Sequence, residues 1–383
     1  MFHIEIKKKE KFIERVSLKY FIHLSSKFKT EDSLKLEDIP SDKILQIVTK
    51  NITFSTVFVA FIVGGLTTVP AVLFEIYYKE IFAPTQYYIL LSALVLVFVM
   101  IEMAILYWLG MRAIYTLASL TGHEEESSLP NEYDVKKMMI RSILDIEEPV
   151  FRYLGIDPQK YVSKKWIFVR MALYKVKKLL TRIVLKFFIK KVATRYSFRV
   201  GLVWLSIPIS AIWDALSIHR TIKDAKIKLF GSKLSKYIAE NILSDKILEP
   251  YSPTIKEGCI RAISNMMVLS HNNHPNNIIL LLRVNKDMTI TEEKDYDNLD
   301  IFLTYLKEAS SKERHLLRSL AGISAIFDSK LNRKKKEALK KIFLEEEERY
   351  MEFSEELRKL LLQGSLHQAA SLCDWMIVYG FEE

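Results

Sequence analysis

The amino-acid sequence predicts an all-α integral membrane protein with a transmembrane helical hairpin and a C-terminal helical bundle. Two nearly uncharged runs, residues 52–74 and 87–109, are each long enough to cross about 30 Å of hydrocarbon as a helix. Residues 237–383 have ordinary soluble composition, with apolar residues at helical spacing and little strand-like alternation. The 383-residue chain has only two cysteines, which excludes a disulfide scaffold.

Residues 1–50 are expected to form a cytoplasmic N-terminal helical arm. They contain eleven Lys or Arg and eight Asp or Glu residues but no early apolar core, so we expect no signal peptide. Cations are dense before the first apolar run and after the second, whereas the loop between the runs contains only Lys79. The positive-inside rule therefore predicts that residues 1–50 and the chain after residue 110 face the cytoplasm.

Residues 51–121 are expected to form the antiparallel transmembrane hairpin, because the loop between the two apolar runs is short. The alternative is a buried core hairpin of a soluble protein, which two neighbouring uncharged runs of this length disfavour. Ala60 and Gly64 have the small-xxx-small spacing that lets helix backbones approach closely. This spacing predicts close packing, either within the hairpin or between copies.

Residues 122–236 are expected to contain basic helices at the membrane surface and a further membrane segment. The uncharged run from Val200 to Trp213 is short for a span, and Pro208 at its centre is a candidate hinge. Cations flank both ends of the run, so a span would place one basic flank outside. A Pro-kinked re-entrant segment within residues 200–218 avoids this conflict. A true third span and a water-soluble helix are the alternatives.

Two ionisable residues mark these apolar runs. Glu102 lies within the second run, and Asp214 directly follows the third. A carboxyl group inside a bilayer costs roughly 2.5–3.5 kcal/mol on insertion scales, so it usually faces a partner or a cavity. Glu102 and Asp214 could belong to a proton or ion path. In the simpler interpretation Glu102 is hydrogen-bonded or protonated and fixes helix packing, with Arg112 or Arg199 as a candidate partner.

A strongly basic stretch precedes Asp214. Residues 158–213 carry thirteen Lys or Arg and no Asp or Glu, which exceeds the formal net charge of +10 for the whole chain. Cations at steps of three and four lie on one face of a predicted helix, opposite apolar residues, as is typical of a helix that binds anionic headgroups. The alternatives are a solvated bundle face and nucleic-acid binding, and the absence of stacking aromatics disfavours the latter. The predicted lipid-binding residues are Lys175, Lys178, Arg182, Lys186 and Lys190.

Residues 237–383 are expected to fold as six or more helices, with breaks at residues 250–253 and 272–277. This region contains an internal repeat, in which residues 287–294 align with 328–335 and the Ile-Phe-Leu of 301–303 aligns with that of 342–344. Each copy is expected to form a helix, then a turn that begins with Asp and caps the next helix. The predicted N-caps are Thr291 and Asn332.

The repeat resembles the TerB (tellurite-resistance B) helical family, in which paired helices are joined by repeated turns of the form Asp-Gly-x-apolar-Ser-x-x-Glu. The resemblance covers about 65 residues, from Ile279 to Leu344. Met288 and Ser329 replace the glycines, and Lys294 and Lys335 replace the final acidic residues. The resemblance implies the helical fold and a role in interaction or signalling near a membrane. The acidic clusters of the family are proposed metal sites, but these lysines argue against carrying metal binding over.

Residues 207–231 are also similar to a signature of uncharacterised bacterial membrane proteins, a resemblance that implies no activity. No Walker A loop, dinucleotide fingerprint, His-Glu-x-x-His or Gly-x-Ser-x-Gly motif occurs. His271 and His274 have a spacing that can chelate a metal, but the surrounding Asn and Pro residues indicate an exposed loop. Cys259 and Cys373 lack a surrounding motif. We therefore expect no enzyme activity, no cofactor and no metal.

The sequence thus predicts a non-enzymatic scaffold or sensor in a bacterial inner membrane. Its basic helix is expected to contact anionic lipid. Its cytoplasmic bundle is expected to recruit a protein partner or to form a homo-oligomer, and nucleic acid is not an expected partner. The alternative is a small oligomeric ion or solute transporter or channel that uses Glu102 and Asp214.

Overall fold

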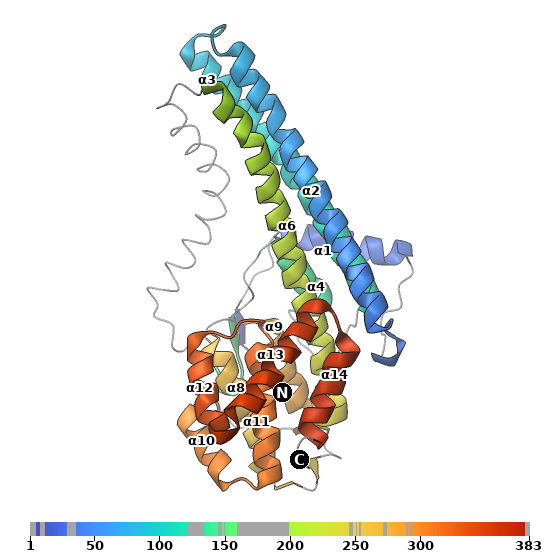
Figure 1. Ribbon diagram of the computed structural model, residues 1–383, viewed down its shortest axis with the longest axis vertical. Helices are drawn as coiled ribbons and strands as arrows, with labels where there is room; N and C mark the ends of the chain where they lie inside the picture. Colours follow the sequence, from blue (N-terminus) through green and yellow to red (C-terminus); the bar gives the residue numbers. More distant parts are fainter. Residues whose placement is uncertain are drawn as a thin grey trace. The chain divides into compact units, whose positions relative to one another are not determined.

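A computed structural model of the chain (Figure 1) describes residues 5–7, 12–28, 36–121, 134–144, 148, 150–158, 199–244, 248–249, 251–252, 254–270, 274–288, 290 and 293–379. Helices dominate these residues, which confirms the predicted all-α class apart from one short pair of strands. The elements are β1 (Glu5–Lys7), α1 (Phe12–Phe28), η1 (Leu36–Asp38), α2 (Asp42–Tyr78), α3 (Pro84–Thr121), α4 (Val135–Leu144), β2 (Val150–Arg152), α6 (Arg199–Tyr237), η3 (Ile238–Ile242), α8 (Thr254–Leu269), α9 (Pro275–Met288), α10 (Leu299–Glu308), α11 (Ser311–Ile326), α12 (Arg333–Phe343), η4 (Leu344–Glu346), α13 (Glu347–Gln363), α14 (Leu366–Asp374) and η5 (Trp375–Tyr379).

The chain divides into two compact units. The three-helix unit comprises residues 50–113 and 162–222, and its described part consists of segments of α2, α3 and α6. The helical unit comprises residues 1–49, 114–161 and 223–383. Each of the helices α2, α3 and α6 continues from one unit into the other.

In the three-helix unit, segments of α2, α3 and α6 run side by side (Figure 1). Near the α2–α3 loop, the ring of Phe74 stacks on those of Tyr87, Tyr78 and Phe82. The Cα of Gly64 faces Ser210 and Ala211 of α6, so α2 and α6 approach closely there. The small-xxx-small pair Ala60 and Gly64 is therefore buried within this unit, and packing between copies is not needed to explain it.

Two helices in the described part of the chain, α2 and α3, are long and apolar enough to cross a membrane. Only 28% of the most apolar window of α2 and 17% of that of α3 are buried. The core helix of a soluble protein would be mostly buried. Large apolar side chains instead point outward along both helices, among them Phe54, Leu66, Ile89, Leu96 and Met100. Such a broad exposed apolar surface is typical of a segment that faces lipid.

The third apolar run does not form the predicted re-entrant turn. Helix α6 runs without interruption from Arg199 to Tyr237, and Pro208 lies inside it. A proline removes one helical hydrogen bond, but packing against a neighbouring helix can maintain the helix around it. Ile207 and Ala211, on either side of Pro208, both lie against Gly65 of α2. The prediction of a hinge that reverses the chain at Pro208 is therefore wrong.

The helical unit contains the predicted C-terminal bundle. Seven α-helices, α8 to α14, form its C-terminal part among the described residues, as the prediction of six or more requires. Helix α11 packs against α8, α12 and α13, and nearly all of its residues are buried. The bundle also includes the second half of α6, because the side chain of Asn276 donates to the carbonyl oxygens of Ile227 (2.8 Å) and Phe327 (3.0 Å). Strands β1 and β2 pair in antiparallel register, with Ile6 opposite Phe151.

The two repeat turns differ in their capping. Asn332 is the N-cap of α12, as predicted, and its side chain accepts a hydrogen bond from the backbone N–H of Lys335 (2.8 Å). Helix α10 instead begins at Leu299, where the side chain of Asn298 is the N-cap. The prediction of Thr291 as the N-cap of that helix is wrong, because the chain after α9 is first held by Asn285, whose side chain bonds the N–H and carbonyl of residue 290.

Candidate functional site

The structure brings the two predicted carboxyl groups onto one buried face of α2. Gly64 and Thr67 are one helical turn apart and share this face. Asp214 of α6 lies against Gly64, and Glu102 of α3 lies against Thr67. Asp214 is 1% exposed and Glu102 is 3% exposed. Sequence reasoning found both acids from their position in apolar runs, but it missed Gly64 and Thr67 as the residues that receive them.

Gly64 is required by the close approach of α6. A Cβ atom at this position would lie 2.6 Å from Oδ2 of Asp214 and 2.9 Å from the backbone oxygen of Ser210. Both distances are shorter than a carbon–oxygen contact allows. At the next position, Gly65, a Cβ atom would meet Ala211 and Ile207 at an ordinary 3.7 Å. The absence of a side chain at Gly64 therefore creates the space that Asp214 occupies.

The hydroxyl of Thr67 connects α2 to Glu102. Its oxygen lies 2.9 Å from Oε2 of Glu102 and 2.9 Å from the carbonyl oxygen of Val63. A threonine hydroxyl has one proton, so it donates to only one of these two acceptors at a time. The contact therefore links α2 to α3 at this level.

The helix register places these acids between two polar boundaries. Helix α3 runs antiparallel to α2, because Thr67 contacts Glu102 whereas Phe74, later on α2, contacts Tyr87, earlier on α3. Helix α6 does the same, because Gly64 faces Asp214 whereas Gly65 faces Ile207. At 1.5 Å per residue, Arg112 of α3 and Arg220 of α6 then lie level with residues 57 and 55 of α2, within two turns of the start of its apolar run. Glu102 lies about 15 Å along α3 from Arg112. That distance excludes Arg112 as its ion-pair partner and equals half of a bilayer hydrocarbon core.

The opposite boundary lies near the α2–α3 loop. By the same register, the start of α6 at residue 199 lies level with Tyr77 of α2, about 30 Å from the level of Arg220. The side chains of Tyr77, Tyr78 and Tyr88 are all at least 45% exposed at this end. Trp108 is 45% exposed at the other end, and the guanidinium of Arg112 lies over its ring. Exposed aromatic residues at both ends of an apolar layer are typical of the two membrane interfaces.

The predicted lipid-binding residues Lys175, Lys178, Arg182, Lys186 and Lys190 lie outside the described residues, as does His271. His274 precedes α9, and its ring is not in an exposed loop, because the Nδ1 atom is buried. Burial lowers the pKa of His274 from 6.5 to about 4. Cys259 and Cys373 are free and buried. The described part of the chain has no group of three or more His, Cys, Asp or Glu residues placed to hold a metal.

A chain of ion pairs in the helical unit, buried except at Asp224, was not found from the sequence. Arg141 of α4 donates to Glu14 of α1 (2.8 Å) and to Glu148 (3.4 Å). Lys228 of α6 donates to Glu148 (2.8 Å) and to Asp224 (3.0 Å). Burial acts to lower the pKa of Lys228, but these two carboxylates outweigh burial and raise it. These five residues lie far apart in sequence, so no local pattern predicts the cluster, which joins α1 and α4 to α6.

The second repeat turn contains a lysine ammonium among oxygen atoms. Nζ of Lys335 donates to Oδ1 of Asp328 (2.7 Å) and to the carbonyl oxygens of Ala325 (2.7 Å) and Lys330 (3.1 Å). The side chains of Lys335 and Asp328 are 0% and 2% exposed. Carboxylate and carbonyl oxygens are the ligands that a hard metal cation prefers. Here the ammonium group of the chain itself satisfies them, so this turn needs no metal.

The first repeat turn places its lysine differently. The side chain of Lys294 is 45% exposed and lies 3.6 Å from a carboxylate oxygen of Glu257. Sequence alignment of the two turns equates Lys294 with Lys335, but the structure places the first lysine at the surface and the second in the core. The two turns therefore do not form equivalent sites.

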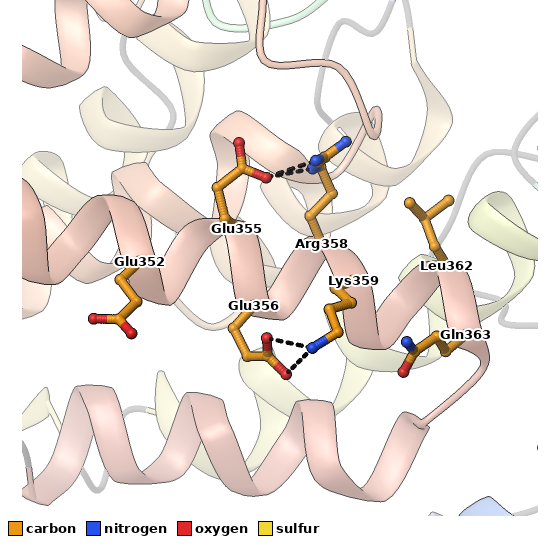
Figure 2. A pocket seen from close by; sticks show the side chains of 7 residues that line it. All are labelled: Glu352, Glu355, Glu356, Arg358, Lys359, Leu362 and Gln363. Atoms are coloured by element: carbon orange, nitrogen blue, oxygen red, sulfur yellow. Dashed lines mark hydrogen bonds and ion pairs between the residues drawn. The ribbon is translucent and has the colours of Figure 1, made fainter.

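A surface depression follows one side of α13 (Figure 2). Charged side chains in it pair within the helix: Glu355 with Arg358 (2.6 Å) and Glu356 with Lys359 (3.1 Å). All the residues that line it come from this single helix. The depression is therefore one side of a single charged helix, and no group from another element converges on it.

Comparison with models of protein families, with curated proteins and with solved structures finds no match for this chain. The resemblance to the TerB family therefore rests on the repeat turns alone.

Proposed function

We propose that the protein is a non-enzymatic, membrane-anchored scaffold or sensor. In this proposal the three-helix unit is embedded in a bilayer, and the helical unit associates with partners at the cytoplasmic face of a bacterial inner membrane. One observation carries the proposal: the three-helix unit exposes apolar residues such as Phe54 and Leu66 and buries the carboxyl groups of Glu102 and Asp214. A water-soluble protein has the opposite distribution.

The proposal includes α6 as a membrane helix. The helical unit contains residues before and after α6 in sequence, so it lies on one face of the bilayer only if the chain also crosses between residues 158 and 199. From residue 199 to Arg220, α6 covers about 30 Å and ends level with the boundaries defined by α2 and α3. Its exposed residues Trp204, Leu205, Ile212 and Leu216 are apolar, whereas Arg220 and Lys223 beyond them are charged. This distribution supports the span over a helix in water.

The association role rests on the helical unit. In the described part of this unit, the buried charged groups of the ion-pair chain and of the second repeat turn are matched by opposite charges. A catalytic site would instead need a reactive group that is accessible to a substrate. The basic residues Lys175, Lys178, Arg182, Lys186 and Lys190 would supplement this role by binding anionic lipid next to the spans.

Introduced cysteines test the orientation, because both natural thiols are buried. Ala83 lies in the exposed α2–α3 loop, and Ser371 is exposed on α14 of the helical unit. A membrane-impermeant maleimide should label A83C in intact spheroplasts. It should label S371C only after the spheroplasts are lysed. Labelling of S371C in intact cells would contradict a cytoplasmic helical unit.

Neutralising the five predicted lipid-binding cations to Gln tests the lipid contact. The protein should then retain less anionic phospholipid through detergent purification, as measured by lipid mass spectrometry. A variant with the same charge change on α12 is the matched control and should retain lipid normally. Equal retention in wild type and the first variant would remove lipid binding from the proposal. The five α12 positions are Arg333, Lys334, Lys336, Lys340 and Lys341.

One observation favours the second candidate, a small oligomeric ion or solute transporter. Glu102 and Asp214 lie against Thr67 and Gly64, one turn apart on α2, near the middle of the apolar layer. However, a water-filled path would leave its lining carboxylates accessible, and these two residues are at most 3% exposed in the single chain. In reconstituted vesicles, E102Q should abolish flux if a path exists. Flux unchanged by this substitution would exclude a transport role for Glu102.

A further inference from the structure

The outer face of α12 carries a stripe of cations. Arg333, Lys336 and Lys340 are exposed at steps of three and four residues, and Lys341 is exposed beside them, while the opposite face of the helix is buried in the bundle. Arg333 pairs with Glu337, and Lys340 pairs with Glu347. No ion pair joins Lys336 or Lys341 to another residue in the described part of the chain. These two cations are therefore available to a partner.

A stripe of acids follows directly on η4 and α13. Glu348 and Glu352 are exposed and four residues apart on α13, so they share one helix side, and Glu345 is exposed on η4 before them. Within the described residues, none of the three carboxylates forms an ion pair. The helical unit therefore presents unmatched positive and unmatched negative charges on two consecutive elements.

Leu344 lies between the two stripes, at the junction of α12 and α13. Its backbone has φ 53° and ψ −121°, a conformation that an L-residue with a side chain rarely adopts. The residue is nevertheless 61% exposed, so its apolar side chain points into solvent. Strained residues of this kind cluster at functional sites, where their conformation serves a contact. A contact with a second copy would remove this apolar side chain from water.

We propose that residues 336–352 form a self-association surface, in which Lys336 and Lys341 of one copy face Glu348 and Glu352 of a second copy around the two Leu344 side chains. In a two-fold symmetric contact, each copy offers the same patch, so a patch with one positive and one negative half is complementary to itself. The apolar centre with a charged rim matches the usual composition of a protein interface. This inference rests on the proposed association role of the helical unit and names its partner.

The charges favour a second copy over an anionic surface. A lipid bilayer or a nucleic acid would attract the cationic half but repel Glu345, Glu348 and Glu352 beside it. Anchoring in a membrane would also raise the local concentration of copies, so a small contact would suffice for pairing.

A charge-swap experiment on the full-length protein in nanodiscs tests the proposal. One variant carries K336E and K341E, and the other carries E348K and E352K. Pairing is read from energy transfer between copies labelled with a donor or an acceptor. Each variant alone should pair at least tenfold more weakly than wild type, because like charges then meet, and a mixture of the two variants should restore pairing. Self-pairing of either variant at wild-type strength, or a mixture that fails to pair, would overturn the proposal.

Two further variants separate association from folding. L344G should raise the melting temperature by relieving the backbone strain, yet weaken pairing by removing the apolar side chain. A folding defect cannot produce this combination, and L344G that pairs like wild type would contradict the role of Leu344. The matched control K286E and K307E has the same charge change at exposed positions on α9 and α10 and should pair normally; loss of pairing in it would reduce the effect to net charge and overturn the proposal.

Other outcomes identify a different partner or a failure of the underlying function. If K336E with K341E reduces binding to anionic vesicles while E348K with E352K does not change pairing, the cationic stripe is a lipid surface and the proposal is wrong. If the wild-type protein is released from membranes by alkaline carbonate, the proposed membrane anchoring fails, whatever the charge swap shows.

Discussion

At the scale of single residues, Lys335 determines the character of the second repeat turn. Its ammonium is buried among the oxygens of Asp328, Ala325 and Lys330. Removing one member of a buried ion pair leaves the other charge uncompensated, at a cost of about 3–5 kcal/mol. We therefore expect K335M to lower the free energy of unfolding by about this amount in chemical denaturation followed by circular dichroism. K336M, which changes an exposed lysine in the same helix, is the control.

The double variant D328N with K335M tests the reason for this loss. It removes both charges together, so it should be more stable than K335M alone if the uncompensated carboxylate causes the damage. Equal stability of the single and double variants would instead assign the loss to packing of the lysine chain.

Ser329 in the same turn offers a stabilising substitution. Its φ of 57° lies in the left-handed region, which glycine adopts without steric cost. S329G should therefore raise the free energy of unfolding by roughly 0.5–1 kcal/mol, the steric gain less the entropy that glycine loses on folding. S329A keeps the strain and should give no gain in the same denaturation experiment. If S329G is less stable than wild type, the hydroxyl of Ser329 contributes more to the free energy of unfolding than the backbone strain costs.

Some residue roles could be predicted from sequence, and others could not. The N-cap Asn332 was predictable because capping depends on residues three positions apart. The burial of Glu102 and Asp214 was predictable because each acid interrupts or ends an apolar run. The opposite environments of Lys294 and Lys335 were not predictable, since the repeat gives both the same local sequence position and only tertiary packing separates them.

At the scale of elements, the contact between α2 and α6 depends on one glycine. A Cβ atom at Gly64 would collide with Asp214 and with the backbone of Ser210, whereas one at Gly65 would make ordinary contacts. G64A should therefore lower the melting temperature of the detergent-solubilised protein by several degrees, and the matched substitution G65A should leave it nearly unchanged. Similar effects of the two substitutions would contradict the close approach of α6 at Gly64.

The start of α11 makes stability depend on acid. Glu313 forms a capping box with Ser310 and also accepts hydrogen bonds from the N–H and hydroxyl of Ser252. Burial alone would raise the pKa of Glu313, but these hydrogen bonds outweigh it and lower the pKa from 4.5 to about 2. Because the folded pKa is depressed, the stabilisation is complete above pH 4.5 and is lost as the pH falls toward 2. It amounts to at most about 3 kcal/mol.

Replacing Glu313 by Gln should remove this dependence. E313Q is expected to be less stable than wild type at pH 7, and the difference should shrink between pH 4.5 and about 2 in thermal unfolding followed by circular dichroism. E308Q changes an exposed glutamate just before this helix and should follow the wild-type pH profile. A constant difference between E313Q and wild type at every pH would show that protonation of Glu313 is not involved.

The elements themselves were predictable where one signal dominates. Helices α2 and α3 follow from uncharged runs of membrane length. The continuous α6 was not predicted, because its uncharged run is short and Pro208 within it favours a break. Gly64 and Gly65 let α2 pack closely against α6 around Pro208. They lie in the apolar run of α2, so the local sequence of α6 does not indicate this packing. The N-cap prediction in the first repeat turn was wrong for a similar reason, because the side chain of Asn285, which precedes the turn, accepts a hydrogen bond from the backbone N–H of residue 290.

At the scale of the whole molecule, the exposed apolar surface of the three-helix unit leads to a test of membrane insertion. Leu66 is 64% exposed within the apolar run, and Ile47 is 60% exposed on the same helix but before the run. A lysine at the centre of a membrane helix costs about 2.5–3.5 kcal/mol on insertion scales. L66K should therefore reduce the fraction of protein that resists extraction by alkaline carbonate, whereas I47K should not. Equal resistance of the two variants would contradict the membrane placement.

The division of the chain into two units could not be predicted from composition. The boundaries fall inside α2, α3 and α6, which cross from one unit to the other without a linker. Sequence-based boundaries rely on loops and shifts in composition, so they set the start of the bundle near residue 237. The structure includes the second half of α6 from residue 223, because Ile227 and Phe230 are buried in that unit.

The burial of both cysteines has a consequence for how the protein responds to oxidation. Burial raises the pKa of Cys259 to about 12 and also raises the pKa of Cys373. Oxidants and disulfides react with the thiolate, a form that these two groups scarcely populate at physiological pH. The natural thiols therefore carry no redox signal, and the protein should keep the same covalent structure in oxidising and in reducing surroundings.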